Sequence, residues 1–371
     1  MSEPIARPER EQIVADATHS FLAVLPPHLA ETVRAAAIPH WFDAALLAAL
    51  LELPQEEADR RYATLQEMPF VQAVGGRGHA LHELTRRLLL DELWAEREAD
   101  FRAWSQRAAN FFDGRAGDET ARIEAIYHWL AADPDRGADL VWDQGATWYN
   151  ESRYNLLFAL IQAGLQHDAG GRLAGRARGW VYYRKGLLHW LYSENREAAE
   201  SLRIASEAAG DDQRLKANCI KSLGDVSLQQ ADYPAARTAY DTARPIYAAI
   251  GVRLGEANCI KSLGDVSRRQ AEYPQARQCY EDALPIYRAI GDRFGEAGTL
   301  LGLGDVAAGV GDRSTAQTMY GHAADLYGAI GVKVWEQIAR DRGAQLENER
   351  SQSLPRRLAE ALKRVWRLGR G

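Results

Sequence analysis

The eleven residues ANCIKSLGDVS occupy positions 217–227 and occur again, unchanged, at positions 257–267. A looser copy, AGTLLGLGDVA, follows at positions 297–307, so the three copies begin 40 residues apart. A repeat of fixed length is typical of a solenoid, in which each unit buries its apolar face against its neighbours. This array therefore decides the fold, and the function depends on what the surface of such an array binds.

Further positions recur at the same step along the chain. They are the Leu-Gly pairs that end at Gly224, Gly264 and Gly304, then Ala236, Ala276 and Ala316, then Tyr240, Tyr280 and Tyr320, and then Ala243, Ala283 and Ala323. Small residues allow the two helices of a hairpin to approach closely, and large aromatic rings fill the gap to the next hairpin. Each second helix ends in the residues AIG, and the glycine predicts a left-handed cap at positions 251, 291 and 331.

This pattern resembles the tetratricopeptide repeat in its 40-residue form. The Leu-Gly pair, the alanine about a dozen residues later, the aromatic residue four further on and the next alanine are the positions that define that family. The resemblance implies a mainly all-α protein, with an α-solenoid of helical hairpins over residues 171–331. Residues 332–350 are expected to form a polar capping helix, as the end of a solenoid requires.

Residues 27–98 follow another pattern. Asp43 stands as an N-cap before the apolar run AALLAALLEL. The stretch PFVQAVGGRGHALH alternates weakly around a glycine-rich break, which predicts a β-hairpin, and a long helix begins near Glu83. Three helices, a hairpin and a further helix give the order of a small winged-helix-like domain.

These residues resemble the winged-helix module of STAND and AP-ATPase regulators, where it follows the nucleotide-binding domain. The matching segments are FDAALLAALLEL, YATLQEMPFV and ALHELTRRLLLDEL. In that family the histidine of a hydrophobic-His-acidic motif contacts the nucleotide, and Leu81-His82-Glu83 stands at that position. The sequence contains no GxxxxGK[ST] phosphate loop. We therefore expect His82 to begin a helix, with contact to a nucleotide held by another protein as the alternative.

Residues 99–170 are predicted to form an irregular helical connector. They are rich in aromatic residues, which at helical spacing indicate a core rather than a ligand site. Three acidic residues, Asp118, Glu119 and Glu124, lie near the start of one of these helices. We interpret them as a solvated cluster that suits the positive end of the helix dipole.

Composition narrows the class of protein. The chain has 371 residues, a formal net charge of -6 and 46% hydrophobic residues, which is typical of a globular protein without a general attraction to nucleic acid. The N-terminus is charged where a secretion signal is apolar, and the longest apolar run is too short to span a bilayer. We expect a cytoplasmic protein.

No catalytic pattern emerges from the sequence. The nine histidines are dispersed, no GxSxG motif occurs, and the three cysteines form no CxxC pair. Cys219, Cys259 and Cys279 are expected to be buried apolar residues. We therefore predict that the chain is not an enzyme and needs no metal or cofactor.

The candidate binding positions follow from the resemblance, because the first helix of each tetratricopeptide hairpin lines a concave groove. The implied inward positions are Asn218, Lys221, Asp225, Asn258, Lys261, Asp265, Leu301 and Asp305. Asparagine amides pair with the backbone of an extended peptide, and lysines hold carboxylates. The alternative is that each lysine pairs with the aspartate four residues later on its own helix.

We therefore expect a module that binds a protein or extended peptide in this groove. It resembles the sensor part of a STAND-like regulator, standing alone or working with a separately encoded ATPase. The alternative is a nucleic-acid-binding transcriptional regulator that uses the winged helix and a basic tail. The helix in the recognition position, near residues 55–68, carries four acidic residues against Arg60 and Arg61, which disfavours contact with phosphates.

The two ends of the chain are less regular. Residues 1–26 are interpreted as an N-terminal segment that forms one helix or frays. Residues 351–371 are predicted to form an amphipathic helix, whose six basic residues against Glu360 give a net charge of +5. This helix is expected to pack on the body of the protein, with contact to a membrane surface or a partner as the alternative.

Overall fold

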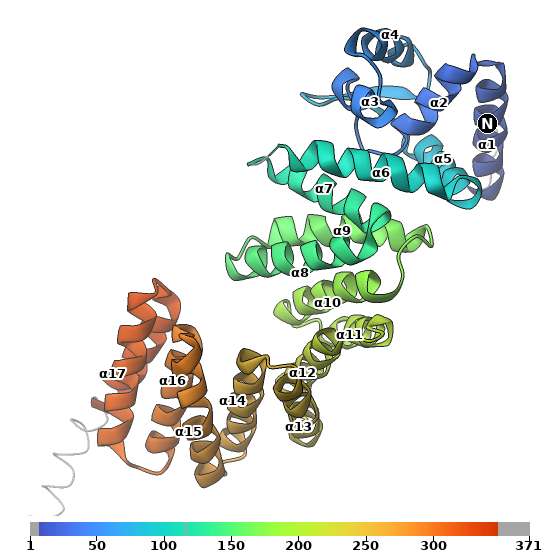
Figure 1. Cartoon of the computed structure of the whole chain (residues 1–371). Coiled ribbons are helices and arrows are strands. Elements are labelled where there is room, and N and C mark those ends of the chain that lie inside the picture. The colour runs from blue at the N-terminus through green and yellow to red at the C-terminus, as the bar shows by residue number, and fades with distance from the viewer. Residues whose placement is uncertain (1–6, 116, 348–371) are drawn as a thin grey trace, which may run out of the picture. The chain divides into compact units, whose positions relative to one another are not determined.

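The computed structural model describes residues 7–115 and 117–347 (Figure 1). The chain divides into two compact units, Met1–Asp211 and Asp212–Gly371, called unit 1 and unit 2 below. The predicted tail helix, residues 351–371, lies outside the described residues. No helix in the described part of the chain is both long and apolar enough to cross a membrane.

Unit 1 opens with helices that surround one β-hairpin. The elements are α1 (Arg7–Val24), α2 (Pro27–Ala36), α3 (Ala44–Leu51), α4 (Gln55–Gln66), β1 (Val71–Val74), β2 (Gly78–Leu81) and α5 (Glu83–Glu96). The predicted hairpin is confirmed: β1 and β2 pair antiparallel, with Val71 opposite Leu81 and Val74 opposite Gly78. Gly76 adopts φ 73° at the turn, a conformation that favours glycine. Phe42 forms a further antiparallel bridge to His79, which joins the segment before α3 to the hairpin.

A single apolar core holds these elements together. Phe42, Leu47, Leu50 and Leu93 are fully buried in it. Asp43 caps α3 as predicted, because its Oδ1 accepts a hydrogen bond of 2.7 Å from the backbone N–H of Leu46. The identification of this part as a winged helix remains a prediction from the sequence.

The rest of unit 1 consists of helices packed side by side. They are α6 (Glu98–Asp113), α7 (Glu119–Ala132), α8 (Pro134–Asn150), α9 (Tyr154–Ala169), α10 (Gly175–Leu191) and α11 (Asn195–Ala208). Helix α10 packs against α8, α9 and α11. The hairpin α10–α11, which lies within the range 171–331 predicted for the solenoid, thus belongs to unit 1.

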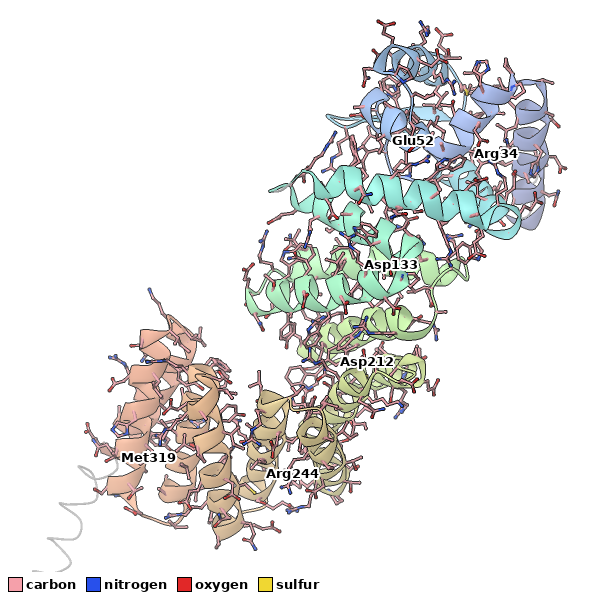
Figure 2. All side chains as sticks on the ribbon, viewed as in Figure 1. Arg34, Glu52, Asp133, Asp212, Arg244 and Met319 are labelled. Atoms are coloured by element: carbon pink, nitrogen blue, oxygen red, sulfur yellow. The ribbon has the colours of Figure 1, made fainter. Side chains whose placement is uncertain are left out.

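Unit 2 contains three regular hairpins that stack in sequence (Figure 1). They are α12 (Gln213–Gln229) with α13 (Tyr233–Ala249), α14 (Arg253–Arg269) with α15 (Tyr273–Ile290), and α16 (Arg293–Gly309) with α17 (Arg313–Ala329). Residues 333–347 form a further helix. The predicted α-solenoid is therefore confirmed, and Figure 2 shows the side chains that fill it.

The repeated small residues have the predicted effect on packing. A Cβ on Gly224, Gly264 or Gly304 would lie 2.8, 2.9 or 2.5 Å from the ring of the tyrosine sixteen positions later. Only glycine therefore allows the two helices of each hairpin to approach this closely. The predicted left-handed caps are also confirmed, with φ of 71°, 74° and 75° at the three AIG glycines.

A polar ladder as the candidate functional site

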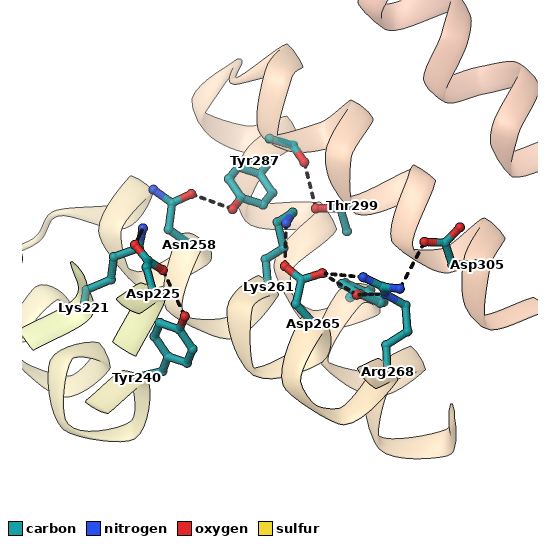
Figure 3. A network of polar contacts seen from close by, with 12 residues as sticks. Lys221, Asp225, Tyr240, Asn258, Lys261, Asp265, Arg268, Tyr287, Thr299 and Asp305 are labelled. Atoms are coloured by element: carbon teal, nitrogen blue, oxygen red, sulfur yellow. Dashed lines mark hydrogen bonds and ion pairs between the residues drawn. The ribbon is translucent and has the colours of Figure 1, made fainter. Parts of the chain in front are cut away.

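The candidate binding residues of unit 2 form a row of polar groups along α12, α14 and α16 (Figure 3). We call this row, together with the tyrosines that bond to it, the polar ladder. The Nζ of Lys221 lies 2.7 Å from Asp225 Oδ2, and the Nζ of Lys261 lies 2.8 Å from Asp265 Oδ2. Each lysine thus pairs with the aspartate one turn later, which is the alternative stated from the sequence.

The second oxygen of each aspartate accepts a hydrogen bond from the following helix. The hydroxyls of Tyr240, Tyr280 and Tyr320 donate to Asp225, Asp265 and Asp305 over 2.9, 2.7 and 2.9 Å. Burial and the neighbouring aspartates raise the pKa of all three tyrosines, so the hydroxyls remain protonated donors. The tyrosines expected only to fill space therefore also fix the aspartates.

A second set of tyrosines fixes the asparagines. The hydroxyl of Tyr247 donates to Asn218 Oδ1 over 2.6 Å, and that of Tyr287 donates to Asn258 Oδ1 over 2.7 Å. Asn218 is buried, and its Nδ2 has no hydrogen-bond partner within the described part of the chain. Each amide oxygen is therefore occupied, and the remaining donors are the amide N–H groups, of which those of Asn218 are enclosed.

The third repeat departs from the first two. Gly298 and Leu301 replace the asparagine and the lysine. Leu301 is 5% exposed and packs in the apolar core of the last hairpin, so we leave it out of the proposed contact residues. Asp305 keeps its place in the row and is bound by two arginines, Arg268 and Arg342.

Arg268 links two repeats, and the sequence did not single it out. Its Nε donates to the Tyr280 hydroxyl over 3.2 Å, while its terminal nitrogens lie 3.8 Å from Asp265 and 3.4 Å from Asp305. The matching residues of the other repeats are Leu228 and Ala308. The difference between Arg268 and these two residues is the feature of the sequence that could have identified Arg268.

The charges of the second repeat stabilise one another. Burial opposes the ionisation of Asp265, but the charge of Lys261 and the hydrogen bonds from Lys261 and Tyr280 outweigh it, so the pKa of Asp265 is lowered. The carboxylate is therefore ionised at neutral pH. The nearby Cys259 is fully buried, and burial raises its pKa to about 12, which keeps the thiol protonated and unreactive.

The other residues singled out from the sequence belong to unit 1. His82 is exposed and precedes the first residue of α5, as expected for a helix start. In α4, Glu57 accepts hydrogen bonds from both Arg60 and Arg61 over 2.7 Å, and these bonds lower the pKa of Glu57 to about 2. Both arginines are therefore bound by Glu57, and Arg61 also donates to His28 and Thr32 of α2, which weakens the case for contacts to phosphates.

One interpretation of the sequence is wrong. Glu124 does not belong to a solvated acidic cluster, because it is 4% exposed. Its Oε1 lies 2.7 Å from His40 Nδ1 and its Oε2 lies 3.6 Å from His128 Nε2. The carboxylate faces histidines instead of water because α7 turns this position toward the interior of unit 1.

The surroundings of Glu124 form a buried polar cluster, which consists of His40, Glu124, Tyr127, His128 and His167. The His167 ring stacks on Tyr127 with centroids 4.1 Å apart, and its Nε2 donates to the Tyr127 carbonyl over 2.9 Å. Burial lowers the pKa of His167 to about 3 and that of His128 well below its usual range, so both rings are neutral. Among the described residues, no group of three or more potential ligands has the arrangement of a metal site.

Comparison with known proteins agrees with the repeat architecture. The model of the tetratricopeptide repeat family matches residues 256–329. A Signal Transduction ATPase with Numerous Domains (STAND) protein with a tetratricopeptide repeat sensor, from Pyrococcus horikoshii, is similar in structure. Its TM-score is 0.52 at 14% identity, and the similarity covers 94% of this chain and 50% of that chain. This chain thus spans half the length of that protein.

Two further solved structures are similar at lower scores. The apo form of RapI has a TM-score of 0.46 at 12% identity, and the similarity covers 71% of this chain and 71% of that chain. Aspartyl phosphate phosphatase F from Bacillus subtilis has a TM-score of 0.41 at 10% identity, with 94% of this chain and 96% of that chain covered. The curated proteins give no match in sequence. The matched family model, the repeated hairpins and their glycine–tyrosine contacts show that unit 2 contains tetratricopeptide repeats, with the family match over residues 256–329.

Proposed function

We propose that the chain is a protein- or peptide-binding sensor module of a STAND-like regulatory system. The observation that carries this proposal is the regular polar ladder of unit 2. It carries the same Asn, Lys and Asp groups twice at the 40-residue step, in nearly the same geometry, with both lysines partly exposed. An extended peptide offers backbone groups at regular intervals, so a regular row of donors suits it.

The exposure of the lysines supports this proposal. The side chains of Lys221 and Lys261 are 26% and 27% exposed, although each is paired with an aspartate. The Lys261 ammonium carries three N–H donors, and its pair with Asp265 is made by one Nζ–Oδ2 contact. The tyrosines fix the aspartates from the other side, so the lysines are held in place before a partner arrives. Such preorganisation lowers the entropic cost of binding.

The STAND-like part of the proposal is supported by the similarity in fold to a STAND protein with a tetratricopeptide sensor. It is also supported by the order of helices and hairpin in residues 27–98, which resembles the winged helix of such regulators. A separately encoded ATPase is proposed as a partner, and His82, exposed at the start of α5, is the residue proposed to contact its nucleotide.

The test is a pull-down with the double substitution Lys221→Glu/Lys261→Glu, which places a carboxylate opposite Asp225 and Asp265. The matched control is Arg244→Glu/Arg277→Glu, because both arginines are exposed on second helices of the same hairpins. We expect the ladder variant to lose the partners that wild type and control recover from the native lysate. Equal recovery by all three proteins would contradict the assignment of the site.

The ATPase proposal is tested separately with the candidate ATPase loaded with nucleotide. Substitution His82→Ala should weaken its association with this chain, while the exposed His19→Ala should leave association unchanged. Unchanged association for both variants would remove the nucleotide contact from the proposal and leave peptide binding by unit 2 unaffected.

A further inference from the structure

The polar ladder has a gap in its third repeat. Gly298 stands where the first two repeats carry Asn218 and Asn258. Those asparagines accept a hydrogen bond from Tyr247 and Tyr287, but the matching tyrosine of the third repeat faces no asparagine. The hydroxyl of this residue, Tyr327, makes no hydrogen bond within residues 7–115 and 117–347.

Two side chains border the space that the missing asparagine would fill. A Cβ on Gly298 would lie 3.3 Å from Lys261 Cε and 3.3 Å from the Tyr327 hydroxyl oxygen. The end of Lys261 therefore reaches from α14 across to α16 at this point. Gly298 is partly exposed, and although Tyr327 as a whole is 2% exposed, its hydroxyl oxygen is not fully enclosed, so the gap opens to solvent at this edge.

The groups at the gap are donors of hydrogen bonds. Lys261 carries three N–H bonds and directs its Nζ to Asp265, and Tyr327 carries one O–H bond. The nearest carboxylate does not meet this need, because the Oδ1 of Asp265 accepts from Tyr280 and its Oδ2 accepts from Lys261. An acceptor from a bound molecule would thus have the Lys261 ammonium on one side and the Tyr327 hydroxyl on the other. A charged acceptor forms the stronger hydrogen bonds with such donors.

Building on the peptide-binding function proposed above, we propose that Gly298 opens a subsite for the carboxylate of a Glu or Asp side chain in an extended peptide. The ammonium of Lys261 and the hydroxyl of Tyr327 both donate to this carboxylate. The absence of a side chain at Gly298 provides the space. Glycine in the interior of a helix costs stability. The third repeat carries glycine at this position, although the first two repeats carry an asparagine there.

The experiment uses the full chain and a display library of random linear peptides as the probe. Selected peptides are synthesised with each Glu or Asp replaced by Gln or Asn, and their dissociation constants are measured for wild type and variants. We expect one acidic position to lose about tenfold in affinity on replacement, as loss of a charge-assisted hydrogen bond predicts.

The decisive variant is Gly298→Asn, which gives the third repeat the residue of the first two. Its Cβ would lie 3.3 Å from Lys261 Cε and from the Tyr327 hydroxyl oxygen, so these two flexible side-chain ends move by a few tenths of an ångström to admit it. The new amide then supplies Tyr327 with an acceptor. We expect this variant to fold like wild type and to bind the acidic peptide and its amide version with equal affinity. Tyr327→Phe should reduce the same preference while leaving the space open.

The matched control is Gly321→Asn, since a Cβ on Gly321 of α17 meets nothing within 4 Å. It should retain the preference for the acidic peptide. Peptides that bind wild type without any acidic preference, or a preference unchanged by Gly298→Asn, would overturn the carboxylate subsite while peptide binding stands. Failure to select any peptide would overturn both proposals.

Discussion

Both units bury polar groups, but they satisfy them in different ways. In the polar ladder of unit 2, a tyrosine of the next helix donates a hydrogen bond to each aspartate, at a sequence separation of 15 residues. In the buried polar cluster of unit 1, neither nitrogen of His128 and only one nitrogen of His167 has a hydrogen-bond partner in the described structure. A buried polar atom without a partner costs free energy. In the described part of the ladder this cost falls on Asn218 Nδ2, whereas in the cluster it falls on three ring nitrogens of His128 and His167.

The difference arises from how each region is assembled. Repeated hairpins bring donor and acceptor together through local packing, and the arrangement that works once works again 40 residues later. The cluster of unit 1 joins distant segments, as the bond of 2.8 Å between His40 and Gln166 across 126 residues shows. We infer that duplication preserves satisfied polar pairs, whereas a polar site made from unrelated helices keeps unpaired atoms that make it sensitive to conditions.

Removal of one ladder tyrosine should give the largest effect. Tyr280 is fully buried, and its ring fills the space over Gly264 and Gly302. Tyr280→Ala should lower the free energy of unfolding by about 3–5 kcal/mol, as loss of a large core aromatic does. Tyr280→Phe keeps the ring and should cost about 1–2 kcal/mol through the lost bond to Asp265. Urea unfolding followed by circular dichroism measures both, and equal costs would show that the hydroxyl outweighs packing.

Mild acid should lower the free energy of unfolding of unit 1 but not that of unit 2. In folded unit 1 the pKa of His128 and His167 is lowered by burial, whereas both titrate near pH 6.5 in the unfolded chain. Their stabilising contribution is therefore complete above about pH 6.5 and falls as the pH drops toward the folded pKa, because the unfolded state binds the protons. The loss approaches about 1.4 kcal/mol per pH unit for each histidine.

Tryptophan fluorescence during urea unfolding at neutral pH and near pH 5 measures this loss, because Trp335 is the one tryptophan in the described part of unit 2. His128→Phe removes one of the two titrating groups and should reduce the dependence of stability on pH by about half. The phenyl ring retains the stack on Phe112, so the variant should still fold. The described part of unit 2 has one histidine, the exposed His322, and should not respond. A response of equal size in both units would contradict the comparison.

The link between repeats should contribute less. Arg268→Leu gives the second repeat the residue that the first repeat carries at position 228. It removes the arginine between Asp265 and Asp305, while Lys261 and Arg342 remain bound to these aspartates. We expect a loss of about 1 kcal/mol in the free energy of unfolding, because the pair is partly exposed. The matched exchange Leu228→Ala tests whether this position matters by itself, and a larger loss for it would argue against the link.

The smallest effect should distinguish the two identical copies. Lys221→Met and Lys261→Met each remove one pair between residues four apart, worth about 0.5 kcal/mol or less. Asp265 keeps Arg268 nearby, whereas Asp225 has Leu228 at the corresponding position. Lys221→Met should therefore cost more than Lys261→Met in chemical unfolding. The reverse order would show that Arg268 does not support Asp265.

The sequence predicted the parts of the fold that depend on local rules. The spacing of glycine, alanine and tyrosine located the hairpins of unit 2, and the AIG segments located their caps. The cap at Asp43 and the β-hairpin that turns at Gly76 were also predicted correctly. In each case one short segment determines the conformation, so a linear pattern is sufficient.

The features that the sequence did not reveal depend on distant residues. Glu124 near a helix start looks solvated until His40, 84 positions earlier, is known to face it. The histidine one turn later, His128, was the local sign that this face is buried. Arg268 was not predicted because the prediction followed residues that recur every 40 positions, and the residues that match Arg268 are Leu228 and Ala308. The hydroxyl bonds of Tyr247 and Tyr287 were visible only as a tyrosine recurring 29 residues after each asparagine.

The identical segments at positions 217–227 and 257–267 have a consequence for folding. During folding, α13 can pack against either of two helices that carry the same eleven residues, so the repeats can misalign by one unit. A second chain carries the same segments, so hairpins can also exchange between chains. Arg268 distinguishes the copies, because it reaches Asp305 only when the second copy precedes the third. It therefore acts as a register marker, as single buried polar residues do in coiled coils.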